Sequence, residues 1–131
     1  MDRLTEALNI IKTNEMASNK ECIVPYSKLV GKVLEVMKAE GYIEDYEEVL
    51  DRERRTKYLR YYHVKLKGRI NNCKAIKPRF PSKKNEWVRW EQQFLPGFGV
   101  GVLIVSTPKG IMDHRKAQEL GLGGRLIAFV F

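Results

Sequence analysis

The chain has 131 residues, 44% of them hydrophobic, which is enough for one ordinary domain or two small packed halves. Its net charge of +8 favours a polyanionic partner, and no stretch approaches the roughly 18 consecutive apolar residues of a membrane span. The start at Met1 opens an amphipathic segment rather than a signal peptide, so we expect a cytoplasmic protein. Cys22 and Cys73 lie far apart without metal-ligand spacing, and neither a metal nor a cofactor is expected.

Charge is unevenly distributed along the chain. Residues 40–53 contain seven acids and one base, a local net charge of −6, which leaves +14 on the rest. Such a run is typical of a solvated face, here one turned away from a polyanion. A metal site or a pair of catalytic carboxylates is the alternative interpretation.

The N-terminal half should fold as helix, strand, helix and two strands. Asp2 is the expected N-cap of the first helix, which ends between residues 12 and 17, and Thr13 and Asn14 fall in the polar loop after it. The remaining segments follow in the order strand 21–24, a helix that stops at Gly41, and a hairpin with strands from residue 42 into the acidic run and over 58–67. Gly68 marks the boundary between the halves.

The turn before the second helix is a candidate anion site. Ser27 is a good N-cap, Lys28 falls in the first helical turn, and Lys32 stands one turn later. The helix dipole disfavours a cation at that end, so a bound anion would explain Lys28. Capping alone also explains Ser27, and both interpretations remain open.

The C-terminal half should be mostly β. Strands are expected around residues 70–76, 100–105 and 125–131, with short helices over 86–93 and 113–120. Nine bases and one acid lie between Lys65 and Arg89. Trp87 and Trp90 fall on the first of these helices, where they either stack on RNA bases or anchor the core.

The strand over residues 100–105 is apolar enough to be buried on both faces, and it breaks into the segment Ser106-Thr107-Pro108-Lys109-Gly110. Pro108 cannot donate to a sheet and Gly110 permits a positive φ, so two hydroxyls and an ammonium are held on a stiff turn. This suits unpaired base edges or phosphate oxygens, or it is simply a turn.

Catalysis has little support in the sequence. No dinucleotide, Walker or nucleophile-elbow motif is present, and His63 and His114 have no partner that the sequence suggests. A small hydrolase that uses Ser106 is the alternative from another functional class.

Several motifs occur together along the chain. They are Ser106–Met112, Pro25–Lys28, Glu40–Ile43, Leu95–Gly97, Leu120–Gly124 and Lys77–Phe80. Jointly they resemble the S-eight family of small-subunit ribosomal proteins, in its archaeal and eukaryotic branch. Bacterial members have Ser where Pro108 stands and an acid where Arg125 stands.

The resemblance implies an α+β fold, with an N-terminal α-β-α-β-β half (residues 1–67) packed against a mostly β C-terminal half (68–131). It implies a non-enzymatic primary binder of the central domain of small-subunit ribosomal RNA that aids subunit assembly. Its partners would be that RNA and neighbouring ribosomal proteins, with the protein a monomer within the ribosome. The alternative is a translational repressor whose messenger mimics the ribosomal site. The expected RNA-binding residues are Ser106, Thr107, Pro108, Lys109, Gly110, Pro25, Tyr26, Ser27, Lys28, Lys32, Asn14, Lys77, Arg79, Lys83 and Lys84.

Overall fold

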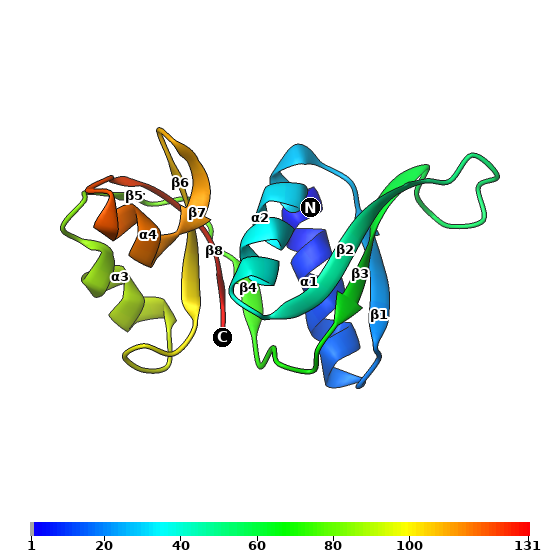
Figure 1. The fold of residues 1–131 in the computed structure, drawn as a ribbon, viewed down its shortest axis with the longest axis horizontal. Coiled ribbons are helices and arrows are strands. Elements are labelled where there is room, and N and C mark those ends of the chain that lie inside the picture. The colour runs from blue at the N-terminus through cyan, green and yellow to red at the C-terminus, as the bar shows by residue number, and fades with distance from the viewer. Residues whose placement is uncertain (1) are drawn as a thin grey trace. The chain divides into compact units, whose positions relative to one another are not determined.

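The computed structural model describes residues 2–131, in which four helices and two antiparallel sheets form a mixed α+β fold (Figure 1). The predicted fold class is confirmed. The chain divides into two compact units: unit 1 ends at Asn71, and unit 2 runs from Asn72 to Phe131. None of the helices in the described part of the chain is long and apolar enough to cross a membrane.

Unit 1 is a three-stranded sheet covered by two helices. Its elements follow the predicted order: α1 (Arg3–Met16), β1 (Glu21–Pro25), α2 (Lys28–Ala39), β2 (Ile43–Leu50) and β3 (Arg60–Leu66). The strands lie in the order β1-β3-β2, and α1 and α2 pack on the sheet and on each other. The predicted alternation in β3 is confirmed, since Tyr62, Val64 and Leu66 are buried on the helix side.

Side-chain caps start both helices of unit 1. Asp2 Oδ1 accepts from the Thr5 N–H at 2.8 Å, and Ser27 Oγ accepts from the Val30 N–H at 3.0 Å, as predicted. Helix α1 ends at Met16, within the predicted range of residues 12–17, but Thr13 and Asn14, which were predicted in the following loop, lie within the helix. The Asn14 amide donates to the Ile10 carbonyl at 2.8 Å, one turn back, so its polarity is satisfied without leaving the helix.

Unit 2 is built around its last strand. It contains β4 (Cys73–Ala75), β5 (Pro81–Ser82), α3 (Trp87–Phe94), β6 (Val102–Thr107), β7 (Gly110–Asp113), α4 (His114–Glu119) and β8 (Gly124–Val130). The sheet order is β4-β8-β6-β7, and β5 also pairs with β8. Trp87 is fully buried and Trp90 is 8% exposed, so both rings anchor the core and do not form a stacking surface.

Candidate nucleic-acid interface

A tight hairpin presents the Ser-Thr segment. Ser106 pairs with Ile111 and Thr107 with Gly110, so β6 and β7 are joined by the two residues Pro108 and Lys109. Strand β7 was not predicted, and the two hydroxyl residues belong to β6 rather than to a loop. Because the four preceding residues of β6 are buried, the half-exposed hydroxyls stand on a rigid base.

The two hydroxyls have different environments. Thr107 Oγ1 donates to the Gly110 carbonyl at 2.9 Å and accepts from the Lys109 N–H at 3.2 Å, so it builds the turn. Within residues 2–131, the Ser106 hydroxyl has no hydrogen-bond partner. Ser106 therefore offers a positioned donor and acceptor to a ligand.

Basic side chains lie at the same end of the sheet. Ser106 pairs with Arg125 on β8, and Arg125 pairs in turn with Pro81 on β5. The Arg125 guanidinium donates to the Arg79 carbonyl at 3.1 Å. Strand pairing thus brings the basic segment around β5 beside the hairpin (Figure 1). The exposed cations of this segment are Lys77, Arg79, Lys83 and Lys84.

Two glycines permit this close assembly. A Cβ on Gly124 would lie 2.0 Å from the Ser106 carbonyl oxygen, and one on Gly123 would lie 2.7 Å from the Ser82 carbonyl oxygen. In the sequence these glycines stand out only as part of the Leu120–Gly124 motif. A glycine pair entering an apolar strand signals close backbone approach, and that signal was available.

In unit 1 the Pro25–Lys28 turn combines a helix cap with cations and a pair of neighbouring aromatic rings. Lys28 and Lys32 are exposed on α2, where the Ser27 cap begins the helix. The Tyr26 ring lies 5.4 Å from the Tyr62 ring, centroid to centroid. Strand β1 extends one residue beyond the predicted range of 21–24, and its last residue, Pro25, is buried.

Asn14 lies away from this turn. Residues Arg3 and Glu6, near the start of α1, line a pocket with Pro25 and Tyr26. Asn14 is two turns further along, about 12 Å from Glu6 by helical rise. Its side chain accepts from Asn19 Nδ2 at 2.8 Å and donates within the helix, so it is committed to the helix end.

A buried pair that the sequence did not suggest supports the hairpin from within. His114 is fully buried, its Nδ1 accepts from the Leu103 N–H at 3.1 Å, and its Nε2 donates to Glu91 at 3.2 Å. Burial lowers the pKa of His114 against the opposing hydrogen bond to Glu91. The predicted isolation of His114 is therefore wrong.

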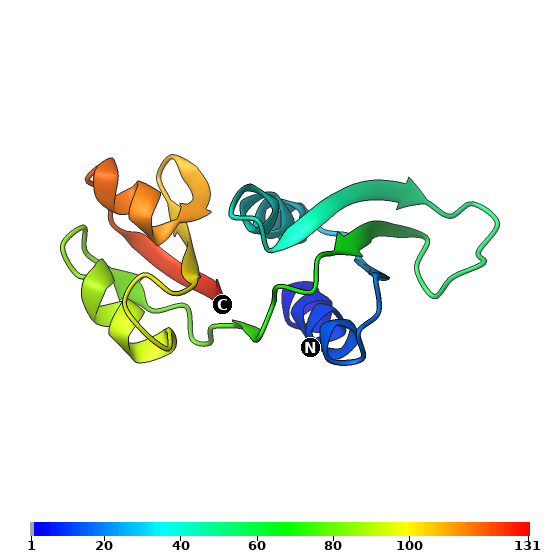
Figure 2. The same cartoon turned by 60° about the horizontal axis from the view of Figure 1, so that its bottom comes forward.

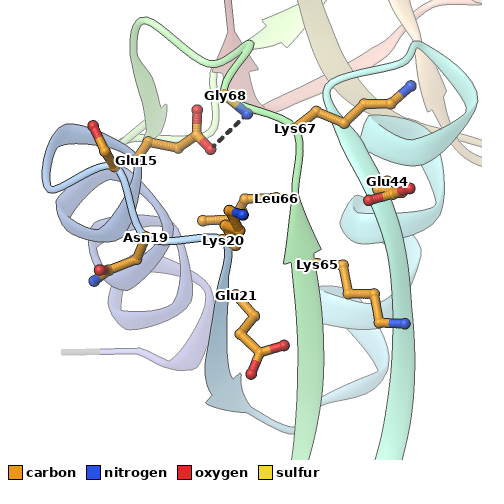
Figure 3. Close-up of a pocket in the computed structure, with 10 residues that line it drawn as sticks. Glu15, Asn19, Lys20, Glu21, Glu44, Lys65, Leu66, Lys67 and Gly68 are labelled. Atoms are coloured by element: carbon orange, nitrogen blue, oxygen red, sulfur yellow. Dashed lines mark hydrogen bonds between the residues drawn. The ribbon is translucent and has the colours of Figure 1, made fainter.

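A second pocket in unit 1, of about 630 Å³, has lysines and glutamates in its lining (Figure 3). Glu15 accepts from the Gly68 N–H at 3.3 Å and from the Ile70 N–H at 3.0 Å, which fastens residues 68–70 to α1. The charges facing this pocket are balanced, and they favour neither anions nor cations. The charged lining residues are Glu15, Glu21, Glu44, Lys20, Lys65 and Lys67.

Metal ligands do not gather in the part of the chain that the structure describes, since no three His, Cys, Asp or Glu side chains are placed to share an ion. Cys22 and Cys73 are both buried, and burial raises the pKa of the Cys22 thiol to about 12. The Cys22 thiol is therefore not ionised for nucleophilic chemistry near neutral pH.

Comparison with known proteins agrees with this picture of a basic, non-catalytic protein. The family model described as Ribosomal protein S8 matches residues 2–131. The small ribosomal subunit protein uS8 of Methanococcoides burtonii is 46% identical over 132 residues, covering 100% of this chain and 98% of the relative. The resemblance stated from the motifs is confirmed. The chain belongs to the ribosomal protein S8 family, which comprises structural proteins of the small ribosomal subunit and not enzymes.

Proposed function

We propose that this protein is a primary binder of the central domain of small-subunit ribosomal RNA and aids subunit assembly. The observation that carries the proposal is the Ser106 hydroxyl, which has no hydrogen-bond partner within residues 2–131 and stands on a strand whose preceding four residues are buried. Cations at Lys109 and Arg125 flank it. A rigid neutral group among cations fits an irregular RNA helix, where base edges are accessible between phosphates.

Unit 1 would position the protein on the RNA backbone and would not recognise the base sequence. Lys28 and Lys32 are exposed at the capped start of α2 and carry no hydroxyl or amide that could read a base edge selectively. Their ammonium groups are suited to phosphate oxygens, whose contacts fix register and orientation. In this arrangement Tyr26 and Ser27 hold the turn in shape.

We further propose that the protein functions as two halves joined at Gly68, acting as a monomer in the cytoplasmic ribosome beside neighbouring ribosomal proteins. Glu15 holds the joint on the unit 1 side through the Gly68 and Ile70 N–H groups. Unit 2 begins soon after, at Asn72.

Nuclease footprinting on complete small-subunit ribosomal RNA tests the proposal. Wild-type protein should protect one helix of the central domain, and Ser106→Ala should lose part of that protection. Thr13→Ala removes an exposed hydroxyl from α1 and is the matched control, which should keep the wild-type footprint. Diffuse protection by the wild-type protein would contradict the proposal. Capture of a messenger in place of ribosomal RNA would favour the repressor alternative.

A further inference from the structure

The loop between β2 and β3, residues 51–59, is an ordered element that projects beyond the sheet of unit 1 (Figure 2). Its base is closed by the Asp51 N–H, which donates to the Leu59 carbonyl at 2.6 Å. The Asp51 carboxylate is turned inward, where one oxygen accepts from the Thr56 N–H at 2.7 Å and from the Thr56 hydroxyl at 2.8 Å. Asp51 is only 8% exposed, so its carboxylate stabilises the loop from within and adds little negative charge to the surface.

The sign of the exposed charge changes at this loop. The sequence suggested an acidic face that continues to Glu53, but Asp51 is buried and Glu53 is ion-paired with Arg55. Arg52 and Arg54 are exposed, and neither guanidinium group has a hydrogen-bond or ion-pair partner within residues 2–131. The outward side chains of the loop therefore present uncompensated guanidinium groups.

A pocket of about 540 Å³ lies at the base of the loop and continues to the Pro25–Lys28 turn. Its lining combines cations with aromatic rings: the Arg60 guanidinium lies 4.0 Å from the Tyr26 centroid, and Lys57 Nζ lies 5.5 Å from the Tyr58 centroid. Glu6, the one acid in the lining, accepts from the Tyr58 hydroxyl at 2.5 Å and from Lys57 Nζ at 3.5 Å, and Arg60 forms an ion pair with Glu48 of β2. Cations beside rings are what single-stranded or irregular RNA backbone requires, because phosphates take the charge and riboses or bases take the rings.

We propose that the β2–β3 loop and this pocket form a second RNA-backbone site, which binds a ribose-phosphate segment of the strand that passes the Pro25–Lys28 turn. The inference rests on the proposed function and extends its surface across the end of unit 1. Arg52 and Arg54 bind phosphates outside the pocket, and Arg60 with Tyr26 takes the adjoining sugar or base. Guanidinium groups suit this role because their planar forks match phosphate oxygens and stack on rings.

The test compares Arg52→Gln/Arg54→Gln with a control that removes the same formal charge. Lys65→Gln/Lys67→Gln neutralises two exposed lysines of unit 1 that lie outside this surface. Binding to complete small-subunit ribosomal RNA is titrated at several KCl concentrations. The arginine variant should lower the slope of log affinity against log salt by about 1.4–1.8, the value for two lost phosphate contacts. The lysine variant should leave the slope unchanged.

Footprinting separates the possible outcomes. The arginine variant should lose one block of backbone protection while the protection that depends on Ser106 remains. If the wild type gives its confined footprint and the arginine variant keeps every protection and the full slope, the loop inference alone is wrong. If the wild type gives no confined footprint, the proposed function is wrong, and this inference with it.

A further outcome concerns a protein partner. If the arginine variant binds RNA normally but is lost from assembled small subunits, the loop contacts a neighbouring protein and the RNA inference is overturned. Thermal unfolding guards against misfolding. Arg52 and Arg54 are exposed, so the variant should unfold at the same temperature as the wild type.

Discussion

His114 Nε2 lies 3.2 Å from Oε2 of Glu91, and both side chains are buried in unit 2. Since His114 Nδ1 accepts the Leu103 N–H, the proton of the neutral ring sits on Nε2. Leu103 lies one residue beyond the β6–β7 ladder, which begins at the pair Ile104 and Asp113. The imidazole thus supplies the partner that another strand residue would otherwise supply.

This arrangement predicts that the protein loses stability as the pH falls below about 6.5. Burial holds the pKa of His114 below its usual 6.5, so the unfolded chain takes up the proton more readily. The contribution of the neutral His114 ring to the free energy of unfolding is complete above pH 6.5. It is lost as the pH falls toward the lowered pKa of His114 in the folded protein. Denaturant unfolding at a series of pH values measures it. His114→Gln should flatten this dependence and cost about 1–3 kcal/mol at neutral pH, since it disturbs buried polar groups.

His63→Gln is the matched control for that experiment. It removes the other imidazole, which lies on the sheet of unit 1 near Glu21 at 3.3 Å. In this variant the loss of stability below pH 6.5 that is due to His114 should persist. An undiminished pH dependence in His114→Gln would contradict the role of the buried pair.

Ser106 and Thr107 should differ in what they contribute to RNA binding. Ser106→Ala should leave the free energy of unfolding within about 0.5 kcal/mol of wild type, because the hydroxyl has no partner in the protein. It should weaken the binding of cognate RNA by about 1–3 kcal/mol, because a hydrogen bond to the RNA is lost. The salt slope should not change, since no charge is removed. Thr107→Val should increase amide exchange in the turn as well as weaken binding, whereas Thr107→Ser keeps the bonding hydroxyl and should behave as wild type. Equal losses on cognate and non-cognate RNA in the Ser106 variant would mean that the hairpin does not confer specificity.

Gly124→Ala should disrupt the interface without touching RNA. The new Cβ would lie 2.0 Å from the Ser106 carbonyl oxygen, so β6 and β8 must separate locally. We expect a loss of about 1–3 kcal/mol in unfolding free energy, together with weaker RNA binding. Gly97→Ala is the control, because its Cβ meets nothing closer than Val100 at 3.8 Å. A wild-type melting curve for Gly124→Ala would show that the strands tolerate the shift.

Lys28→Ala/Lys32→Ala should weaken binding to every RNA alike. Each lost phosphate contact should lower the salt slope by about 0.7–0.9. The measurement is titration of cognate and unrelated RNA in parallel, with Lys65→Ala/Lys67→Ala as the charge-matched control. Selective loss on cognate RNA would instead assign these lysines to base recognition.

Glu15→Ala should expose the joint after β3 to trypsin, which cleaves after Lys67 and Arg69. Two N–H groups of this segment bond to the Glu15 carboxylate, and their release should speed cleavage about tenfold or more. Glu21→Ala is the control. Glu21 lines the same pocket but does not bond to this segment, so the variant should be cut at the wild-type rate. Equal rates for Glu15→Ala and wild type would contradict the fastening role.

The sequence predicted those features that depend on neighbouring residues. The caps at Asp2 and Ser27 were both predicted, because each cap bonds to an N–H three residues away. The buried strand before Ser106 was found because its apolar run is continuous. The identity of the hairpin as a candidate site followed from the turn residues and the family resemblance.

Features that depend on strand pairing could not be predicted from local pattern. The His114–Glu91 contact joins residues 23 positions apart, and β7 has only four residues, too few for a periodicity to stand out. The role of Trp90 remained ambiguous because a large ring among bases suits a core and a stacking surface equally. Only the packed sheet distinguishes the two.

The central position of β8 has a consequence for synthesis on the translating ribosome. Strands β4, β5 and β6 all pair with β8, yet β8 is translated after each of them. While β8 is still in the exit tunnel, β6 can pair only with β7. The carbonyl of Ser106 then lacks the strand against which it packs. A nascent chain therefore cannot present the finished hairpin, and its affinity for RNA should arise late, once the residues from Gly124 onward have emerged.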